Sequence, residues 1–142
     1  CGQCAMKNIN GFYEPNRNRV VVCETNDLDE KRIVRTLRHE LIHAYDNAHG
    51  VVVGEEGKMD WHDPKQRACS EIRAAFLSGD CDILSELSRG NVARVFVGPN
   101  SCARRRAILS LSLQKITKKE ARQATDEVFA QCGVDRRPFE EV

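Results

Sequence analysis

Several features that mark large classes of protein are missing from this 142-residue sequence. The longest apolar runs, such as residues 20–23, cover a few residues, whereas a membrane-spanning helix needs about 20. The 22 Lys and Arg nearly balance the 21 Asp and Glu, so no general field attracts nucleic acid. There is also no internal repeat and no linker rich in Pro, Gly or Ser. We therefore expect a single domain over residues 1–142, without a spanning helix or a nucleic-acid partner.

Cysteine, in contrast, is abundant. Seven cysteines are many for a reducing compartment, so we expect an oxidising compartment and disulfide bonds. Only Cys1 and Cys4 have the C-x-x-C spacing of a zinc knuckle, and no second such pair completes a four-thiolate site. Spacing does not give the pairing, and the disulfide candidates are Cys1, Cys4, Cys23, Cys69, Cys81, Cys102 and Cys132. Because the chain begins at Cys1 rather than Met, we expect a truncated N-terminus.

Local patterns predict an α+β fold, with an N-terminal hairpin and packed helices. The β-forming segments 9–14 and 19–24 flank the turn 15–18, which is typical of a hairpin. Apolar residues at helical spacing follow a predicted N-cap at Asn26-Asp27 and end at Gly50. We expect a loop over 50–64 with a short strand at 51–53. Helices are expected at 64–79, 81–89 with Asp80 as its cap, 102–114, and 118–132 with a Thr117/Glu120 capping box.

The segment RHELIHAYD, residues 38–46, lies on the first predicted helix. Residues four apart share one helical face, so His39 and His43 can direct ring nitrogens at one metal ion. Glu40 lies about 100° around the helix from His39, where it can act as general base towards a water at the metal. A chance match is the alternative, but a packing face rarely carries two polar rings without a partner. We predict a catalytic Zn²⁺ site with His39 and His43 as ligands and Glu40 as the catalytic base.

A catalytic zinc needs a third protein ligand, and several downstream residues are candidates. Glu71 is preferred, because its helix is long enough to pack across the first and its neighbours Ser70, Ala74 and Ala75 allow close approach. His62 is the main alternative, Asp60 is a further one, and His49 more naturally ends its helix.

Two other groups of charged residues have competing interpretations. Asp46 shares the helical stripe of the histidines, so it either accepts a ligand histidine's free N–H or is solvated. The run 104–106, three consecutive arginines, spreads around a helix and favours a solvated face over a basic patch.

A larger set of residues carries a family resemblance. The segments that carry this resemblance are HELIHAYD, Asp60-Trp61, ACSEIRAAFLSGDC at 68–81, Cys102, DEVFAQC and the final RPFEEV. Through these segments the sequence resembles the mitochondrial inner-membrane metalloproteases that process and help assemble ATP synthase. The resemblance covers nearly the whole chain, from Cys1 to Phe139. It implies a zincin-like domain, His39 and His43 as zinc ligands, Glu40 as base, and Glu71 as the glutamate ligand on the next helix.

The resemblance also implies a setting. Members of that family are peripheral to the inner membrane on the intermembrane-space side, which suits many cysteines and no spanning helix. They remove the presequence of a membrane-sector subunit of ATP synthase and promote that subunit's assembly without needing the protease centre.

Two functional hypotheses follow. The first is a zinc endopeptidase that cleaves a peptide held as an extended strand along the hairpin edge. The second is a non-proteolytic assembly factor or structural subunit of a mitochondrial membrane complex. The intact H-E-x-x-H favours the first, because a binding role alone gives no reason for Glu40.

Overall fold

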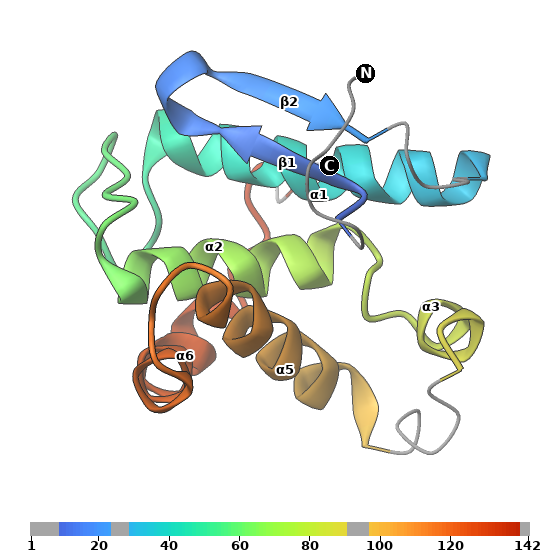
Figure 1. Cartoon of the computed structure of the whole chain (residues 1–142). Helices are drawn as coiled ribbons and strands as arrows, with labels where there is room; N and C mark the ends of the chain where they lie inside the picture. The colour runs from blue at the N-terminus through green and yellow to red at the C-terminus, as the bar shows by residue number, and fades with distance from the viewer. Residues whose placement is uncertain (1–8, 24–28, 91–96, 140–142) are drawn as a thin grey trace.

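The computed structural model describes residues 9–23, 29–90 and 97–139, and shows a hairpin followed by packed helices (Figure 1). The elements are β1 (Gly11–Glu14), the 3-10 turn η1 (Pro15–Arg17), β2 (Arg19–Val22), α1 (Glu30–His49), α2 (Pro64–Leu77), α3 (Ile83–Ser88), α5 (Gly98–Ser112) and α6 (Lys118–Cys132). The predicted α+β class is confirmed. The organisation of residues 1–142 as one domain stays a prediction.

The hairpin has the predicted turn and an ordered register. Gly11 lies opposite Val22 in the antiparallel pair. Pro15 opens the turn and Asn18 closes it at a φ of 44°, a left-handed conformation that asparagine tolerates. The N–H of Cys23 donates to the carbonyl of Asn10 at 2.9 Å. Alternation along an antiparallel ladder therefore directs the backbone groups of Gly11 and Tyr13 away from β2.

Helix α1 carries the H-E-x-x-H motif and contacts both strands and α2. It begins after Asp29, whose carboxylate accepts the N–H of Arg32 at 2.7 Å. It ends at Gly50, which has a φ of 74° and donates its N–H to the carbonyl of Asp46. The predicted N-cap at Asn26-Asp27 lies outside the described residues.

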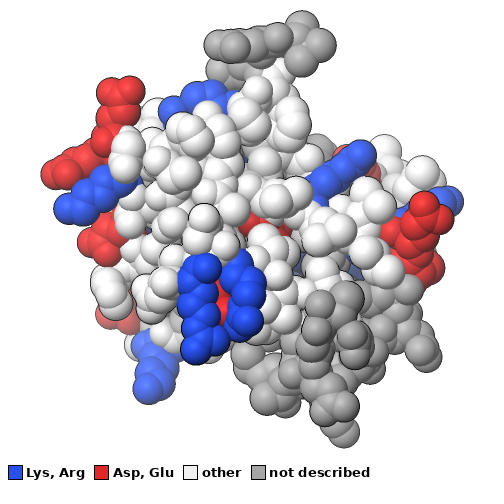
Figure 2. Space-filling view, turned by 90° about the horizontal axis from the view of Figure 1, so that it is seen from above, with Lys and Arg blue, Asp and Glu red and all other residues white. Residues whose placement is uncertain are grey.

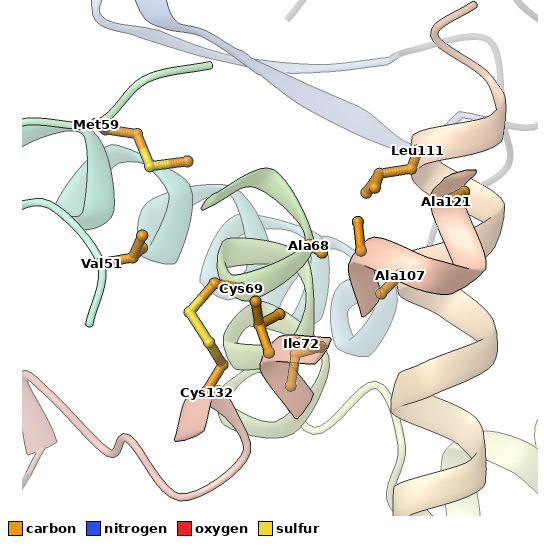
Figure 3. Close-up of a cluster of buried hydrophobic side chains, with 11 residues drawn as sticks. Val51, Met59, Ala68, Cys69, Ile72, Ala107, Leu111, Ala121 and Cys132 are labelled. Carbon is orange, nitrogen blue, oxygen red and sulfur yellow. A yellow bond between two sulfur atoms is a disulfide. The ribbon is translucent and has the colours of Figure 1, made fainter. Parts of the chain in front are cut away.

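Helix α2 is the central element, since it packs against α1, α5 and α6 (Figure 1). Asp63 caps its N-terminus and Pro64 occupies the first turn. Small residues, with Ala68, Ala74 and Ala75 fully buried, let neighbouring helices approach it from several sides. The main core lies between α2, α5, α6 and the segment before α2, and it includes Val51, Met59, Ala68, Cys69, Ile72, Ala107, Leu111, Ala121 and Cys132 (Figure 3).

The structure corrects the predicted strand at 51–53. The carbonyl of Val51 accepts the N–H of Gly54 at 2.9 Å, which closes a turn, and no strand pairs with this segment among the described residues. Val51 is buried in the core, whereas Val52 is half exposed. Val53, partly buried, also packs against the core, so the apolar run reflects side chains packed from a turn rather than a strand.

Two helix starts also differ from prediction. α3 begins at Ile83 with Asp82 as its N-cap, so Asp80 is not the cap. α5 begins at Gly98 rather than residue 102, whereas α6 and its Thr117/Glu120 capping box are as predicted.

The molecular surface has no dominant sign of charge on the face seen in Figure 2, where acidic and basic side chains are interspersed. Over residues 9–23, 29–90 and 97–139, none of the helices combines the length and apolar character needed to cross a bilayer.

Candidate metal centre

Three side chains from two helices converge. His39 and His43 project from successive turns of α1, and Glu71 faces them from α2. Nε2 of His39 lies 3.5 Å from Oε2 of Glu71, and Nε2 of His43 lies 3.7 Å from Oε1. Ligand atoms at the corners of a tetrahedral zinc site, each ~2.0–2.1 Å from the ion, are separated by about 3.4 Å. The spacing and the donor types of the three side chains therefore fit a zinc ion.

The other candidate ligands are not part of this group, which is the one cluster of this kind in the described part of the chain. Asp60 and His62 are exposed, and a carboxylate oxygen of Asp60 accepts the backbone N–H of His62. His49 stacks on Tyr45 at the exposed end of α1. The structure thus brings Glu71, rather than Asp60, His62 or His49, to the paired histidines.

His39 is oriented through its second ring nitrogen by Asp80. Nδ1 of His39 lies 3.0 Å from Oδ2 of Asp80, whose side chain is almost entirely buried. A proton on Nδ1 directed at this carboxylate leaves Nε2 as the lone-pair nitrogen. Sequence reasoning missed Asp80, because an aspartate just before a helix has the pattern of an N-cap.

His43 is oriented by a serine and a buried carboxylate. The hydroxyl of Ser70 donates to Oδ2 of Asp46 at 2.7 Å, and Nδ1 of His43 lies 2.7 Å from the same hydroxyl oxygen. Since Ser70 has only one proton, His43 must donate from Nδ1, which leaves its Nε2 free to bind a metal. Asp46 is fully buried rather than solvated, and it acts on His43 through Ser70 rather than directly.

Asp46 is itself paired with a buried cation. The guanidinium of Arg73, also fully buried, forms an ion pair with Asp46, and its Nε lies 3.2 Å from Oδ2 of Asp135. This network links α1 and α2 to the segment that follows α6. A buried charge of either sign is tolerated here because each is matched by an opposite one.

The protonation of the cluster follows from burial and from these pairs. The pKa of His39, which burial alone would lower, is raised to about 10 by Asp80 and Glu71. The pKa of Glu71, which burial alone would raise, is lowered to about 2 by the two histidines and Ser110. Burial lowers the pKa of His43 to about 4. Without a metal ion, therefore, the positive charge of protonated His39 balances the negative charge of the Glu71 carboxylate.

Glu40 lies beside the cluster and is buried. Desolvation raises its pKa to about 7, an effect partly opposed by His39 and by a hydrogen bond from the backbone of Tyr13. A carboxylate with a pKa near neutral can accept and release a proton at physiological pH. The contact with Tyr13 ties this carboxylate to the outward-facing edge of β1.

An aromatic side chain, Trp61, lies between His43 of the cluster and Tyr13 of β1. Trp61 lies edge-on to the ring of His43, with centroids 5.9 Å apart, and also contacts Tyr13. Its indole N–H donates to Asn47 at 2.7 Å, which fixes the ring. The Asp60-Trp61 motif thus places an aromatic ring, and not a metal ligand, beside the histidines.

Of the three consecutive arginines, Arg105 and Arg106 differ from the predicted solvated face, whereas Arg104 and its partner are more exposed. Arg104 pairs with Asp126, Arg105 with Glu86 and Arg106 with Asp80. The carboxylates of Glu86 and Asp80 are buried, so Arg105 and Arg106 are only one-third exposed. Each arginine serves a different carboxylate.

Disulfide bonds are present, as predicted, and two of them join α2 or the segment after it to later helices. Cys69 of α2 is bonded to Cys132 of α6, and Cys81, after α2, is bonded to Cys102 of α5. Cys23 is disulfide-bonded as well. Cys1 and Cys4 lie outside the described residues.

Comparison with known proteins places the chain in a family. The model of the peptidase M76 family matches residues 1–140. The chain belongs to the peptidase M76 family. This confirms the resemblance found in the sequence.

The family includes proteins named mitochondrial inner membrane protease ATP23. The Yarrowia lipolytica protein is 38% identical over 144 residues, covering 100% of this chain and 54% of that protein. The Homo sapiens homologue is 36% identical over 134 residues, covering 93% of this chain and 51% of that protein. The Schizosaccharomyces pombe protein is 33% identical over 144 residues, covering 100% of this chain and 73% of that protein. The chain spans about half the length of the first two. No solved structure matches.

Proposed function

We propose that this chain is the catalytic domain of a zinc-dependent endopeptidase. The observation that carries the proposal is the convergence of His39, His43 and Glu71, with the buried carboxylate of Glu40 beside them. A bound zinc ion would supply Lewis acidity, polarising a peptide carbonyl and lowering the pKa of the attacking water. Glu40 takes the proton of that water and passes it to the departing amine.

The hairpin supplies a means of holding the substrate. The backbone groups of Gly11 and Tyr13 point away from β2, and Tyr13 contacts Glu40. An extended polypeptide that pairs with this edge of β1 would run past Glu40. The substrate class we propose is therefore a polypeptide in an extended conformation.

The cellular role we propose is the processing of a membrane-subunit precursor of ATP synthase, together with help in its assembly. The name mitochondrial inner membrane protease ATP23, carried by relatives across the whole length of this chain, supports this role. We further propose peripheral association with the inner membrane on the intermembrane-space side. The Cys69–Cys132 and Cys81–Cys102 disulfides support this, because disulfides persist in oxidising compartments.

The test combines metal content with cleavage. We expect one zinc per chain in the wild type and in Glu40→Gln, and a marked loss in Glu71→Ala. Glu40→Gln should cleave a precursor of the membrane subunit at a rate lower by at least about 10²-fold, the usual contribution of a general base. Glu30→Gln, an exposed residue of the same helix, is the matched control and should cleave normally.

Three outcomes bear on separate parts of the proposal. Undiminished cleavage by Glu40→Gln would exclude the assigned base. If Glu40→Gln supports assembly of the complex in cells as well as the wild type while cleavage is lost, assembly does not depend on proteolysis. If the wild type binds no zinc, the H-E-x-x-H motif has only a structural role, and the non-proteolytic function is favoured.

A further inference from the structure

One face of α5 reaches the metal centre without contributing a ligand. Cys102, Arg106 and Ser110 follow one another at four-residue steps, so they lie on the same side of the helix. Cys102 is bonded to Cys81, Arg106 pairs with Asp80, and Ser110 donates a hydrogen bond to Glu71. The partners of these three residues are therefore the proposed ligand Glu71 and the segment Asp80-Cys81, whose aspartate orients His39.

The contact of Arg106 acts on His39 through a shared oxygen. Nη2 of Arg106 lies 2.7 Å from Oδ2 of Asp80, and that same oxygen lies 3.0 Å from Nδ1 of His39. Arg89 faces the other oxygen, Oδ1, at 3.8 Å. The carboxylate is therefore held by cations on both sides, and the imidazole that points at it cannot rotate without losing its partner.

The backbone of Asp80 is anchored to the same helix. The next residue, Cys81, is covalently joined to Cys102, one turn before Arg106 on α5. The preceding residue is Gly79, which has a φ of 80°, a conformation that suits glycine. The segment thus leaves α2 by a sharp bend and is fixed to α5 immediately afterwards.

Ser110 acts on the third ligand directly. Its hydroxyl lies 2.5 Å from Oε1 of Glu71, the oxygen that faces His43, while Oε2 faces His39. A hydrogen bond to one oxygen sets the rotation of the carboxylate plane. It therefore decides which oxygen is presented to the position between the histidines.

We propose that Arg106 and Ser110 are positioning residues of the metal centre: Arg106 orients His39 through Asp80, and Ser110 orients Glu71. The inference rests on the proposed zinc-dependent function. Arg104, two residues before Arg106, offers a matched contrast, because it pairs with Asp126 on the surface and stacks over Phe129.

The experiment measures zinc affinity by chelator competition in the wild type, Arg106→Gln, Ser110→Ala and Arg104→Gln. Loss of a group that orients a ligand typically weakens metal binding by about 10- to 100-fold, and we expect this range for the first two variants. Arg104→Gln should bind zinc like the wild type. Absorption spectra of the Co²⁺-substituted proteins should change in the first two variants only, since ligand geometry controls that spectrum.

A double-mutant cycle tests the route of the effect. If Arg106 acts through Asp80, adding Arg106→Gln to Asp80→Asn should weaken zinc binding far less than Arg106→Gln does alone. Additive losses would overturn the relay. Arg106→Lys, which keeps the cation, should restore part of the affinity.

Other results separate failure of this inference from failure of the proposed function. Wild-type affinity and spectrum in either Arg106→Gln or Ser110→Ala would overturn the inference while leaving the zinc site intact. If Arg106→Gln does not fold, Ser110→Ala decides, because the proposal requires both residues to act. A wild type that binds neither Zn²⁺ nor Co²⁺ would overturn the proposed function itself.

Discussion

At the scale of single residues, the centre depends on which nitrogen of each histidine is available. Both rings face a polar partner with Nδ1 and face Glu71 with Nε2, but the partners differ. Asp80 is a carboxylate acting on His39 directly, whereas Ser70 transmits the effect of Asp46 to His43. The hydroxyl of Ser70 donates to Asp46 and accepts from His43, so removing it affects both of these side chains.

Ser70→Ala should therefore be costly for its size. It leaves Nδ1 of His43 without its acceptor and Asp46 without one donor, both in buried positions. We expect the free energy of unfolding to fall by about 1–3 kcal/mol, with weaker zinc binding. Ser112→Ala, whose hydroxyl bonds only to the carbonyl of Ile108 in its own helix, is the control. Urea unfolding checks both, and equal stability of the two variants would contradict the role of Ser70.

Zinc uptake should release a proton from His39. With a pKa of about 10, this ring is protonated at pH 7.5, and a metal can bind Nε2 only after that proton leaves. The apparent affinity should therefore rise between pH 7.5 and 9, by up to about tenfold per unit. Calorimetry of the chelator-treated protein in buffers of different ionisation enthalpy measures the protons released. An affinity that does not change with pH would rule out a protonated His39.

At the scale of helices and strands, local patterns predicted the elements that carry the ligands. The periodicity of α1 and the Pro64 start of α2 were sufficient, and the small neighbours of Glu71 indicated close packing. Local patterns failed where a side chain's partner is distant in sequence. Asp80 and Asp82 are equally good N-caps by sequence, and only contacts with His39 and Arg106 separate them.

The same limit explains the residues that sequence reasoning did not single out. Ser110 and Ser112 lie on the same helix and have similar neighbours in the sequence. Ser110 nevertheless donates to Glu71, whereas Ser112 donates to the carbonyl of Ile108 in its own helix. Arg106 was indistinguishable from its two neighbours. Their roles arise from the packing of α5 against α2, which no local pattern encodes.

The close packing of α2 leads to a prediction of its own. Ala75 is fully buried beside the Cys81–Cys102 disulfide and lies one turn after Glu71. Ala75→Leu should force α2 away from α5, lowering the free energy of unfolding by about 1–3 kcal/mol and weakening zinc binding. Ala48→Leu, at an exposed position of α1, should change stability by less than about 0.5 kcal/mol. Thermal unfolding compares the pair, and an unaffected Ala75→Leu protein would show that the interface is loosely packed.

At the scale of the whole molecule, the disulfides join segments far apart in the chain. Cys69 and Cys132 are separated by 63 positions, and Cys81 and Cys102 by 21. Each of these bonds also has a cysteine next to an orienting residue, since Cys69 precedes Ser70 and Cys81 follows Asp80. We therefore expect both the stability of the fold and the geometry of the centre to depend on oxidation of these cysteines.

Replacing each disulfide with paired serines should show this coupling. On the chain-entropy model, the longer loop contributes about 4 kcal/mol and the shorter about 3 kcal/mol to stability. We expect the Cys69/Cys132 variant to be the less stable, and both to bind zinc more weakly than the wild type. Unfolding curves and chelator competition measure the two effects. Wild-type zinc affinity in both variants would show that the disulfides stabilise the fold without acting on the centre.

The network around Arg73 has a consequence for the order of events as the protein folds. All three proposed ligands lie between residues 39 and 71, but the groups that hold them extend through Arg106 and Ser110 to Asp135. A chain folded only as far as α3 contains every ligand and lacks those later supports. Capture of the metal should therefore be a late step, completed only when the last helix has docked and the segment after it has closed over Arg73.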